Sequence, residues 1–194
     1  MKFRDLTADE IEVRVQSIKQ NNGTPTGAVL LLYKNARCDM NILDETVGAE
    51  NWQREHYECK GNMFCRVGIS CKMNIDQSGN NGDVITPSWV WKSDCGTESN
   101  TEAQKGEASD SFKRACFNWG IGRELYTSPF IWITTDKFKC YDTGRKDKYG
   151  NPIFATNDRF SVEKIIIENK RITALSIRND TQNVRAFVLK PSTL

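Results

Sequence analysis

The sequence has a single histidine, no long apolar run and no phosphate-loop motif, and each absence excludes a class of protein. No stretch of about 18 apolar residues is present, so a membrane-spanning helix is not expected. The N-terminal stretch MKFRDLTADEIEVR carries acidic residues where a signal peptide requires an apolar core. Without a phosphate-loop motif, no nucleotide cofactor is expected. We therefore predict a soluble protein of the cytoplasm.

The spacing of the cysteines argues against a metal site. Seven cysteines lie between Cys38 and Cys140, separated by 21, 6, 6, 24, 21 and 24 residues, and none forms a C-x-x-C pair. A structural zinc site requires closely spaced pairs of ligands. An odd number of cysteines in a reducing compartment indicates free thiols, most of them small core residues. We expect neither a metal nor another cofactor.

Charge of one sign is also not in excess. The 194 residues include 27 basic and 25 acidic side chains, for a net charge of +2. A nucleic-acid-binding face would therefore require charges to be segregated on the surface. The length supports one domain with a substantial core, with room for an appendage.

The first third of the chain predicts alternating helices and strands. Thr7 and Glu10 form a capping pattern at the start of residues 5–20, in which Ile11, Val15 and Ile18 mark one apolar face. A helix is expected there. A buried strand over residues 28–33 and a short helix over residues 38–46 follow.

Three antiparallel strands are expected next, over residues 53–60, 63–75 and 84–92. Apolar residues and cysteines occupy every odd position from Met63 to Ile75, which is typical of a strand with one buried face. This alternation places Cys65 and Cys71 in the core, together with Cys59. His56 is expected on the opposite, polar side with Arg54 and Glu58.

Residues 101–126 contain the helix around which the chain is organised. Its apolar stripe has helical spacing and consists of Ala108, Phe112, Ala115, Cys116 and Trp119. Gly120 and Gly122 predict that the helix ends near residue 120. By spacing alone, Lys113 and Arg114 belong to a solvated face, with Arg114 paired to Asp110.

The C-terminal part predicts further strands. A strand over residues 130–134 is followed by a long charged loop over residues 136–159. Three strands then form a β-meander, either as a separate subdomain or as an extra layer; they span residues 160–167, 171–178 and 184–189. The expected domain boundaries are 1–126 for the core, 127–159 for the strand and loop, and 160–194 for the meander. The predicted fold class is α+β.

The order of residues in the long helix is more specific than their spacing. Ala103-x-Lys105, Ser109-Asp110-x-Phe112-Lys113-Arg114-Ala115 and Trp119-Gly120 resemble the signature helix of the Rad52 family of single-strand annealing proteins. That helix typically reads Ala-x-Lys, Thr-Asp-x-Leu-Lys-Arg-Ala, Phe-Gly. The segment from Asn41 to Gly48, followed by Asn51-Trp52, is similar to another family segment, with Val47 where the family usually has Phe. The resemblance covers roughly residues 5–126.

The resemblance implies binding of single-stranded DNA and ATP-independent annealing of complementary strands in homologous recombination and repair. Family members include eukaryotic repair proteins and many phage recombinases, and we expect a phage-type protein, located in the host cytoplasm. The family forms rings with a DNA groove on the outside, which would turn a modest cationic strip into a long track. A single-strand-binding protein or an exonuclease is a candidate partner. No catalytic residue is expected.

The resemblance also implies which residues line the groove. The Lys-Arg pair and residues near the first strand hold the DNA backbone in the family. Phe117 stands where the family often has a further basic residue. Lys105, Arg66 and Lys72 are alternative cations, although a solvated sheet face explains Arg66 and Lys72 equally well. The expected DNA-binding residues are Lys113, Arg114, Tyr33, Lys34 and Arg37.

Three other classes of function fit parts of the sequence. A helix, three strands and a helix is also the order of a double-stranded nucleic-acid-binding module. A thiol hydrolase would need an exposed cysteine beside His56, but the neighbouring cysteines alternate into the core. A carboxylate nuclease has no supporting spacing, although acidic residues are available at Asp83, Asp94, Glu98 and Glu102.

Overall fold

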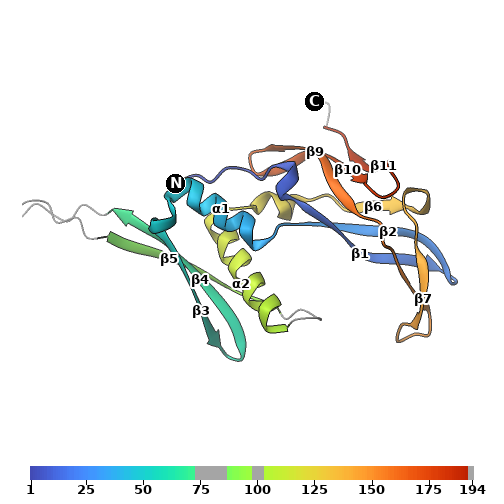
Figure 1. Cartoon of the computed structure of the whole chain (residues 1–194), viewed down its shortest axis with the longest axis horizontal. Coiled ribbons are helices and arrows are strands. Elements are labelled where there is room, and N and C mark those ends of the chain that lie inside the picture. The colour runs from blue at the N-terminus through green and yellow to red at the C-terminus, as the bar shows by residue number, and fades with distance from the viewer. Residues whose placement is uncertain (73–86, 98–102, 192–194) are drawn as a thin grey trace, which may run out of the picture. The chain divides into compact units, whose positions relative to one another are not determined.

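The computed structural model describes residues 1–72, 87–97 and 103–191 of the chain (Figure 1). Within these ranges, the side chains at positions 72, 87 and 103–105 are not described. Helices and antiparallel sheets are combined in one chain, so the predicted α+β class is confirmed. The part of the prediction that concerned residues 73–86 and 98–102, including the end of the alternating strand, lies outside the described residues.

The chain divides into two compact units, which do not follow the expected boundaries. The first, here called the helical unit, comprises Met1–Arg4 and Asn35–Ile121. The second, here called the six-stranded unit, comprises Asp5–Lys34 and Gly122–Leu194. Residues 5–34 therefore group with the C-terminal strands rather than with residues 35–126.

The helical unit confirms the expected pattern of a short helix, three strands and a long helix. The three strands pair antiparallel in the order β3-β4-β5, and helix α2 packs against β4 and β5 (Figure 1). The elements are α1 (Ala36–Val47), the 3-10 turn η2 (Ala49–Asn51), β3 (Trp52–Cys59), β4 (Asn62–Lys72), β5 (Pro87–Cys95) and α2 (Ala103–Trp119).

Helix α2 buries the centre of the predicted stripe, while Ala108 and Trp119 at its two ends are half-buried, and the helix ends where the glycines predicted. Phe112, Ala115 and Cys116 are fully buried. The amide of Gly120 donates to Phe117 O at 2.9 Å, and that of Ile121 donates to Cys116 O at 3.1 Å. Gly120 has a φ of 100°. These two bonds and the positive φ form a Schellman motif, which satisfies the last carbonyls of the helix.

The face of β3 that meets the helices differs from the prediction. Cross-strand partners share a face of an antiparallel sheet, and His56 pairs with the buried Cys65. Arg54 and His56 therefore lie on the helix-covered face, whereas Cys59 is exposed. A two-residue turn at Lys60-Gly61 sets this register, because both residues have positive φ. A turn longer by one residue would exchange the two faces.

The six-stranded unit is built on a hairpin where the sequence predicted a helix. The capping box of Thr7 and Glu10 is present, but it closes only the 3-10 turn η1 (Ala8–Glu10). Strand β1 (Glu12–Asn21) then pairs with β2 (Thr24–Tyr33) along its whole length. The turn at Asn22-Gly23 has two positive φ angles, as a tight hairpin requires.

A β-bulge explains why β1 resembles a helix in sequence. The pairing of β1 with β2 shifts between Val15 and Ser17, so Gln16 is an extra residue. Val15 pairs with Leu30 and Ile18 pairs with Ala28, which keeps Val15 and Ile18 on one face although they are three residues apart. The bulge thus produces a spacing that a helix would also give.

The remaining strands complete one sheet in the order β11-β10-β9-β1-β2-β6. The β-meander is confirmed, and it continues the N-terminal hairpin because Glu12 pairs with Ser161 and Val13 with Phe160. It is therefore neither a separate subdomain nor an extra layer. These elements are η3 (Arg123–Thr127), β6 (Ile131–Thr134), η4 (Thr135–Lys137), β9 (Phe160–Glu168), β10 (Arg171–Asn179) and β11 (Val184–Leu189).

Residues 136–159 are not the continuous loop that the sequence predicted. They contain a two-stranded hairpin of β7 (Tyr141–Lys146) and β8 (Pro152–Ala155). Polar residues and glycine dominate β7, and β8 is only four residues long, so apolar alternation gives no signal there. Asp147 instead organises the turn by accepting backbone hydrogen bonds from Tyr149 and Asn151, at 2.8 and 2.9 Å.

Candidate nucleic-acid interface

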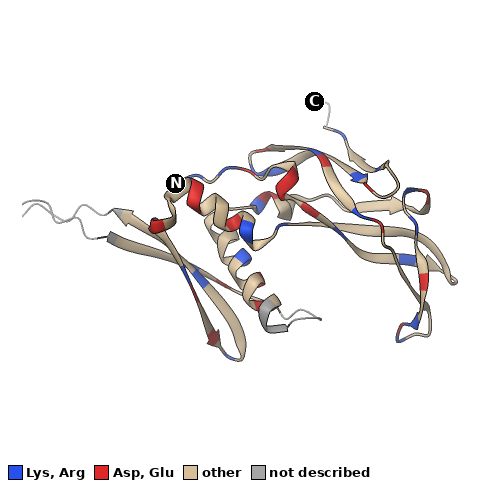
Figure 2. Cartoon of the chain, in the orientation of Figure 1, with Lys and Arg blue, Asp and Glu red and all other residues tan. Residues whose placement is uncertain are grey.

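Basic side chains of the helical unit come from both helices and from the sheet. Figure 2 shows Lys and Arg on α1, α2 and the three-stranded sheet, interspersed with Asp and Glu. Lys113, Arg114, Arg37 and Arg66 belong to this unit. The two helices and this sheet therefore carry the candidate interface.

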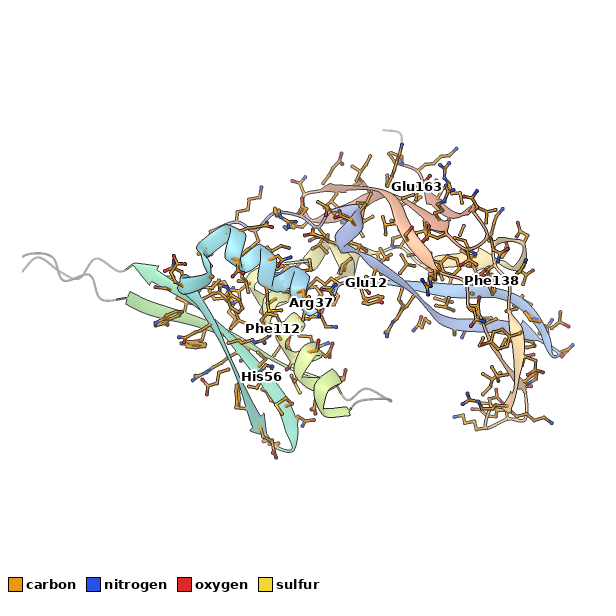
Figure 3. All side chains as sticks on the ribbon, in the orientation of Figure 1. Glu12, Arg37, His56, Phe112, Phe138 and Glu163 are labelled. Carbon is orange, nitrogen blue, oxygen red and sulfur yellow. The ribbon has the colours of Figure 1, made fainter. Side chains whose placement is uncertain are left out.

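A pocket of about 350 Å³ opens between the start of α1, strand β3 and the middle of α2. Arg37 comes from α1, Arg54 and His56 come from β3, and Ser109 comes from α2. Figure 3 shows Arg37, His56 and Phe112 on these three elements. Residues from three separate parts of the sequence thus place two guanidinium groups and the imidazole at one pocket.

The N-terminal cap of α1 fixes the backbone from which Arg37 reaches the pocket. Asn35 caps α1, because its side chain accepts a hydrogen bond from the amide of Cys38 at 3.0 Å. Arg37 then lies in the first turn and is exposed to solvent. The partial positive charge of the helix start adds to that of Arg37, which favours an anionic ligand.

The aromatic core of the unit holds Arg54. Its guanidinium carbon lies 4.8 Å from the centroid of the Phe112 ring, which is fully buried. The ring of Trp52 also stacks on Phe112, with 6.2 Å between the two ring centroids. A cation over an aromatic face is stabilised in a defined position, and Arg54 is therefore oriented before any ligand arrives.

Lys113 lies one helical turn beyond the pocket. It follows Ser109 by four residues, so both lie along the same side of α2. Lys113 is half-buried, and within the described ranges no carboxylate forms an ion pair with it. Lys113 is therefore a candidate third cation beside Arg37 and Arg54, and the three are here called the cationic strip.

Arg114 has a different position from Lys113, and the expected pairing with Asp110 is wrong. Its Nε lies 3.5 Å from Oδ1 of Asp94 on β5. Asp110 instead accepts hydrogen bonds from the amide and the hydroxyl of Thr97, at 3.1 and 3.0 Å. The helix is thus tied to the sheet through Arg114 because tertiary packing brings Asp94 closer than the i−4 residue.

Arg66 lies on the face of the sheet that α2 does not cover. Its Nη2 is 2.6 Å from Oε2 of Glu55, and its guanidinium carbon lies 4.5 Å from the ring centroid of Trp91. Trp89 and the stacked pair of Tyr57 and Phe64 share this face. The structure therefore does not bring Arg66 together with Arg37 and Lys113. The side chains of Lys72 and Lys105 lie outside the described part of the chain.

Tyr33 and Lys34 belong to the six-stranded unit. Two effects raise the pKa of Tyr33 to about 12: the larger is a hydrogen bond with Glu12, and the smaller is burial. The guanidinium carbon of Arg14 lies 5.7 Å from the Tyr33 ring centroid. Lys34 is only 2 % exposed. A DNA contact by either residue stays a prediction.

The surroundings of His56 do not favour a thiol hydrolase. His56 Nε2 is hydrogen-bonded to the carbonyl oxygen of Ala108 at 3.0 Å, not to a thiol. Cys65 is opposite His56 in the sheet, and burial raises the pKa of this thiol to about 11.

Of the proposed nuclease carboxylates, Asp94 pairs with Arg114, and Asp83, Glu98 and Glu102 lie outside the described residues.

The fold and the pocket define an α+β protein with a site suited to an anionic ligand. A comparison with models of protein families matches residues 4–141 to the Rad52/22 family of double-strand break repair proteins. This match covers more than half of the chain, and the protein belongs to that family. Comparisons with curated proteins and with solved structures gave no match.

Membership in this family gives the class of activity. The protein is assigned to DNA repair and recombination. Members of the family are annealing proteins rather than classical enzymes. The match extends past Tyr126, where the resemblance seen in the sequence ended, through β6 to the start of β7. No helix in the described ranges has the length and apolar character needed to cross a bilayer.

Sequence reasoning missed Arg54 and His56 as members of the pocket. Both residues were assigned to the opposite face of the sheet, because β3 itself lacks apolar alternation. The signal that could have located them was Gly61, because glycine readily adopts the positive φ of a two-residue turn, and this turn fixes the register with β4.

Proposed function

We propose that this protein binds single-stranded DNA along the helical unit and anneals complementary strands without ATP, as a ring-shaped homo-oligomer. The observation that carries the proposal is the convergence of Arg37 and Arg54 on one pocket, with Lys113 one turn further along α2. Several cations on one unit fit the repeated phosphates of a DNA backbone.

The arrangement of this strip favours a backbone-binding mode. Arg37, Arg54 and Lys113 supply positive charge, and a phosphate held there would leave its base free to point away from the protein. Exposed bases can pair with a second strand without first melting hairpins. The proposal therefore requires no bond-making chemistry, in keeping with the annealing role of the family.

The low net charge supports an oligomeric arrangement. A charge of +2 on one subunit is small for tight binding to DNA at physiological salt. Several subunits that present the same strip to one strand would bind it with avidity. A closed ring would supply such a continuous track, and the role of Tyr33, Lys34 and Arg114 in lining it belongs to the same proposal.

The test is annealing of two complementary oligonucleotides, followed by fluorescence in the absence of ATP. We expect faster annealing than without protein, and preferential binding of a single strand over blunt duplex. Affinity should fall with salt, with a log–log slope of about −0.7 for each phosphate contact. A salt-independent affinity or a preference for duplex would contradict the proposal and favour a double-stranded nucleic-acid-binding module.

Arg37→Ala and Arg54→Ala are the informative variants, and Lys148→Ala is their control. Lys148 is an exposed cation of the six-stranded unit that stacks on Tyr149, 4.9 Å from its ring centroid. Each variant removes one positive charge. Weaker DNA binding by the two pocket variants but not by Lys148→Ala would assign the effect to the pocket rather than to net charge.

A further inference from the structure

One ring nitrogen of His56 is already engaged by the protein. A carbonyl oxygen can only accept a hydrogen bond, so His56 Nε2 carries a proton and donates it to Ala108 O at 3.0 Å. In the neutral ring, the other nitrogen, Nδ1, is then an acceptor. A phosphate oxygen is also an acceptor, so a neutral His56 has no donor left for it.

The charged groups around His56 come from every element that packs against it. Arg54 and Glu58 flank it on the same face of β3, and Arg37 comes from α1. From α2, Glu107 accepts a hydrogen bond from the amide of Met63 at 2.8 Å, and Lys113 lies one turn beyond Ser109.

Beyond His56, the same face of the sheet carries a thiol and an ion pair. Cys65 lies opposite in β4, and burial raises its pKa to about 11, which keeps the thiol neutral. Asp94, the cross-strand partner of Cys65 on β5, pairs with Arg114. The cations Arg37 and Arg54 thus dominate the pocket, and a phosphate would reverse the local balance of charge.

We infer that His56 is a proton-dependent phosphate contact, which binds a DNA phosphate through Nδ1–H only when the ring is an imidazolium. This inference rests on the proposed function, since it concerns the same pocket. Protonation keeps the bond from Nε2 to Ala108 O and adds a second donor.

Two measurable consequences follow from this geometry. Binding of single-stranded DNA takes up a proton, and affinity rises as pH falls through the range where histidine titrates. Linkage to one proton limits the change to tenfold per pH unit, and we expect about three- to tenfold tighter binding at pH 5.5 than at pH 8. The chain has a single histidine, so no other imidazole contributes.

The first experiment uses the wild-type protein and oligothymidylate, whose bases do not titrate in this range. The ring Cε1–H signal of the only histidine is followed by NMR from pH 5 to pH 8.5, with and without DNA. We expect the midpoint of its titration to move to higher pH in the complex. An unchanged midpoint in the presence of bound DNA would overturn the inference while leaving the proposed function intact.

The second experiment counts protons by calorimetry in two buffers with different enthalpies of ionisation, for wild type and His56→Gln. The glutamine amide can still donate to Ala108 O, but it has no titratable nitrogen. We expect uptake of up to one proton by wild type near pH 6.5, and close to none by His56→Gln. Equal uptake by the two proteins would refute the role of His56.

The two experiments also separate this inference from the function on which it rests. If oligothymidylate does not bind at any of the pH values tested, the proposed function and the inference are both contradicted. Binding that persists in His56→Gln with the pH dependence of wild type would sink the inference alone. Because the NMR measurement uses wild type, the inference stays testable even if His56→Gln fails to fold.

Discussion

The Nε of Arg114 lies 3.5 Å from Oδ1 of Asp94, so the second residue of the Lys-Arg pair contacts the sheet rather than the helical position four residues earlier. Lys113, its neighbour in sequence, forms no such tie within the described ranges. Two adjacent cations of the signature helix therefore have different surroundings: one is held against β5, and the other lies in line with the pocket.

This difference predicts that Lys113→Ala and Arg114→Ala are not equivalent. Lys113→Ala should lower single-strand affinity several-fold while changing the free energy of unfolding by less than about 0.5 kcal/mol. Arg114→Ala should also lower stability, by up to about 1 kcal/mol, because the lost ion pair is partly exposed. Urea denaturation and fluorescence anisotropy measure the two effects. Normal DNA binding by the double variant would contradict a DNA-binding role and show that Lys113 and Arg114 belong only to a solvated face of the helix.

Gly96 should tolerate no side chain. Its amide donates to Met63 O at 2.8 Å, and a Cβ at this position would overlap the carbonyl oxygen of Glu107. Gly96→Ala must therefore move α2 away from the sheet, which should destabilise the protein by more than about 2 kcal/mol. Gly61→Ala is the control, since no atom lies within 4 Å of its Cβ position. Its positive φ predicts a smaller loss, of about 1 kcal/mol, in the same urea titration.

The stability of the six-stranded unit should depend on pH through Glu163, labelled in Figure 3. Hydrogen bonds from Arg185 and then from Ser176 lower the pKa of Glu163 to about 2. A carboxyl group whose pKa is lowered by folding stabilises the folded state at pH values above those at which an unfolded glutamate titrates. This stabilisation is lost as the pH falls toward 2.

Glu163→Gln should consequently melt at a lower temperature than wild type at pH 7. The difference in Tm should shrink between about pH 4.5 and pH 2, where wild type loses the charge as well. Thermal unfolding followed by circular dichroism at several pH values tests this. A Tm difference that stays constant down to pH 2 would show that the charge of Glu163 is not responsible.

The purified protein is expected to form a large closed homo-oligomer. The reason is the small number of cations in the strip of one subunit, which is too few for tight binding at physiological salt. Light scattering coupled to size exclusion, with and without DNA, gives the mass. A 22.1 kDa particle under both conditions would contradict the proposed ring.

Truncation after Asp158 should unfold the six-stranded unit rather than release a dispensable appendage. It removes β9, β10 and β11, which carry the buried Phe160, Leu175 and Ile177. It also removes the partner of β1 at Glu12 and Val13. We expect loss of soluble protein and of β-sheet signal in circular dichroism. A soluble, fully folded truncated chain would show that the meander is not part of this core.

Local patterns determined much of this protein before any tertiary information. The stripe from Ala108 to Trp119 and the glycines after it predicted α2 and its end, because helix period and a positive φ are properties of the segment itself. The alternation along β4 predicted its buried face for the same reason, and the turn residues between the meander strands predicted where these strands lie in the sequence. The order of residues in α2 was also sufficient to indicate the family.

Tertiary structure alone decided which segments pair and which charges meet. Ile11, Val15 and Ile18 satisfy a helical period, and only pairing with β2 through a bulge at Gln16 places Val15 and Ile18 on one face of a strand. Arg54 and His56 reach the pocket because a turn of two residues sets the register of β3, and a single residue more would place them on the other face. Contacts between residues distant in sequence, such as Arg114 with Asp94, depend on the packing of whole elements, which no local pattern records.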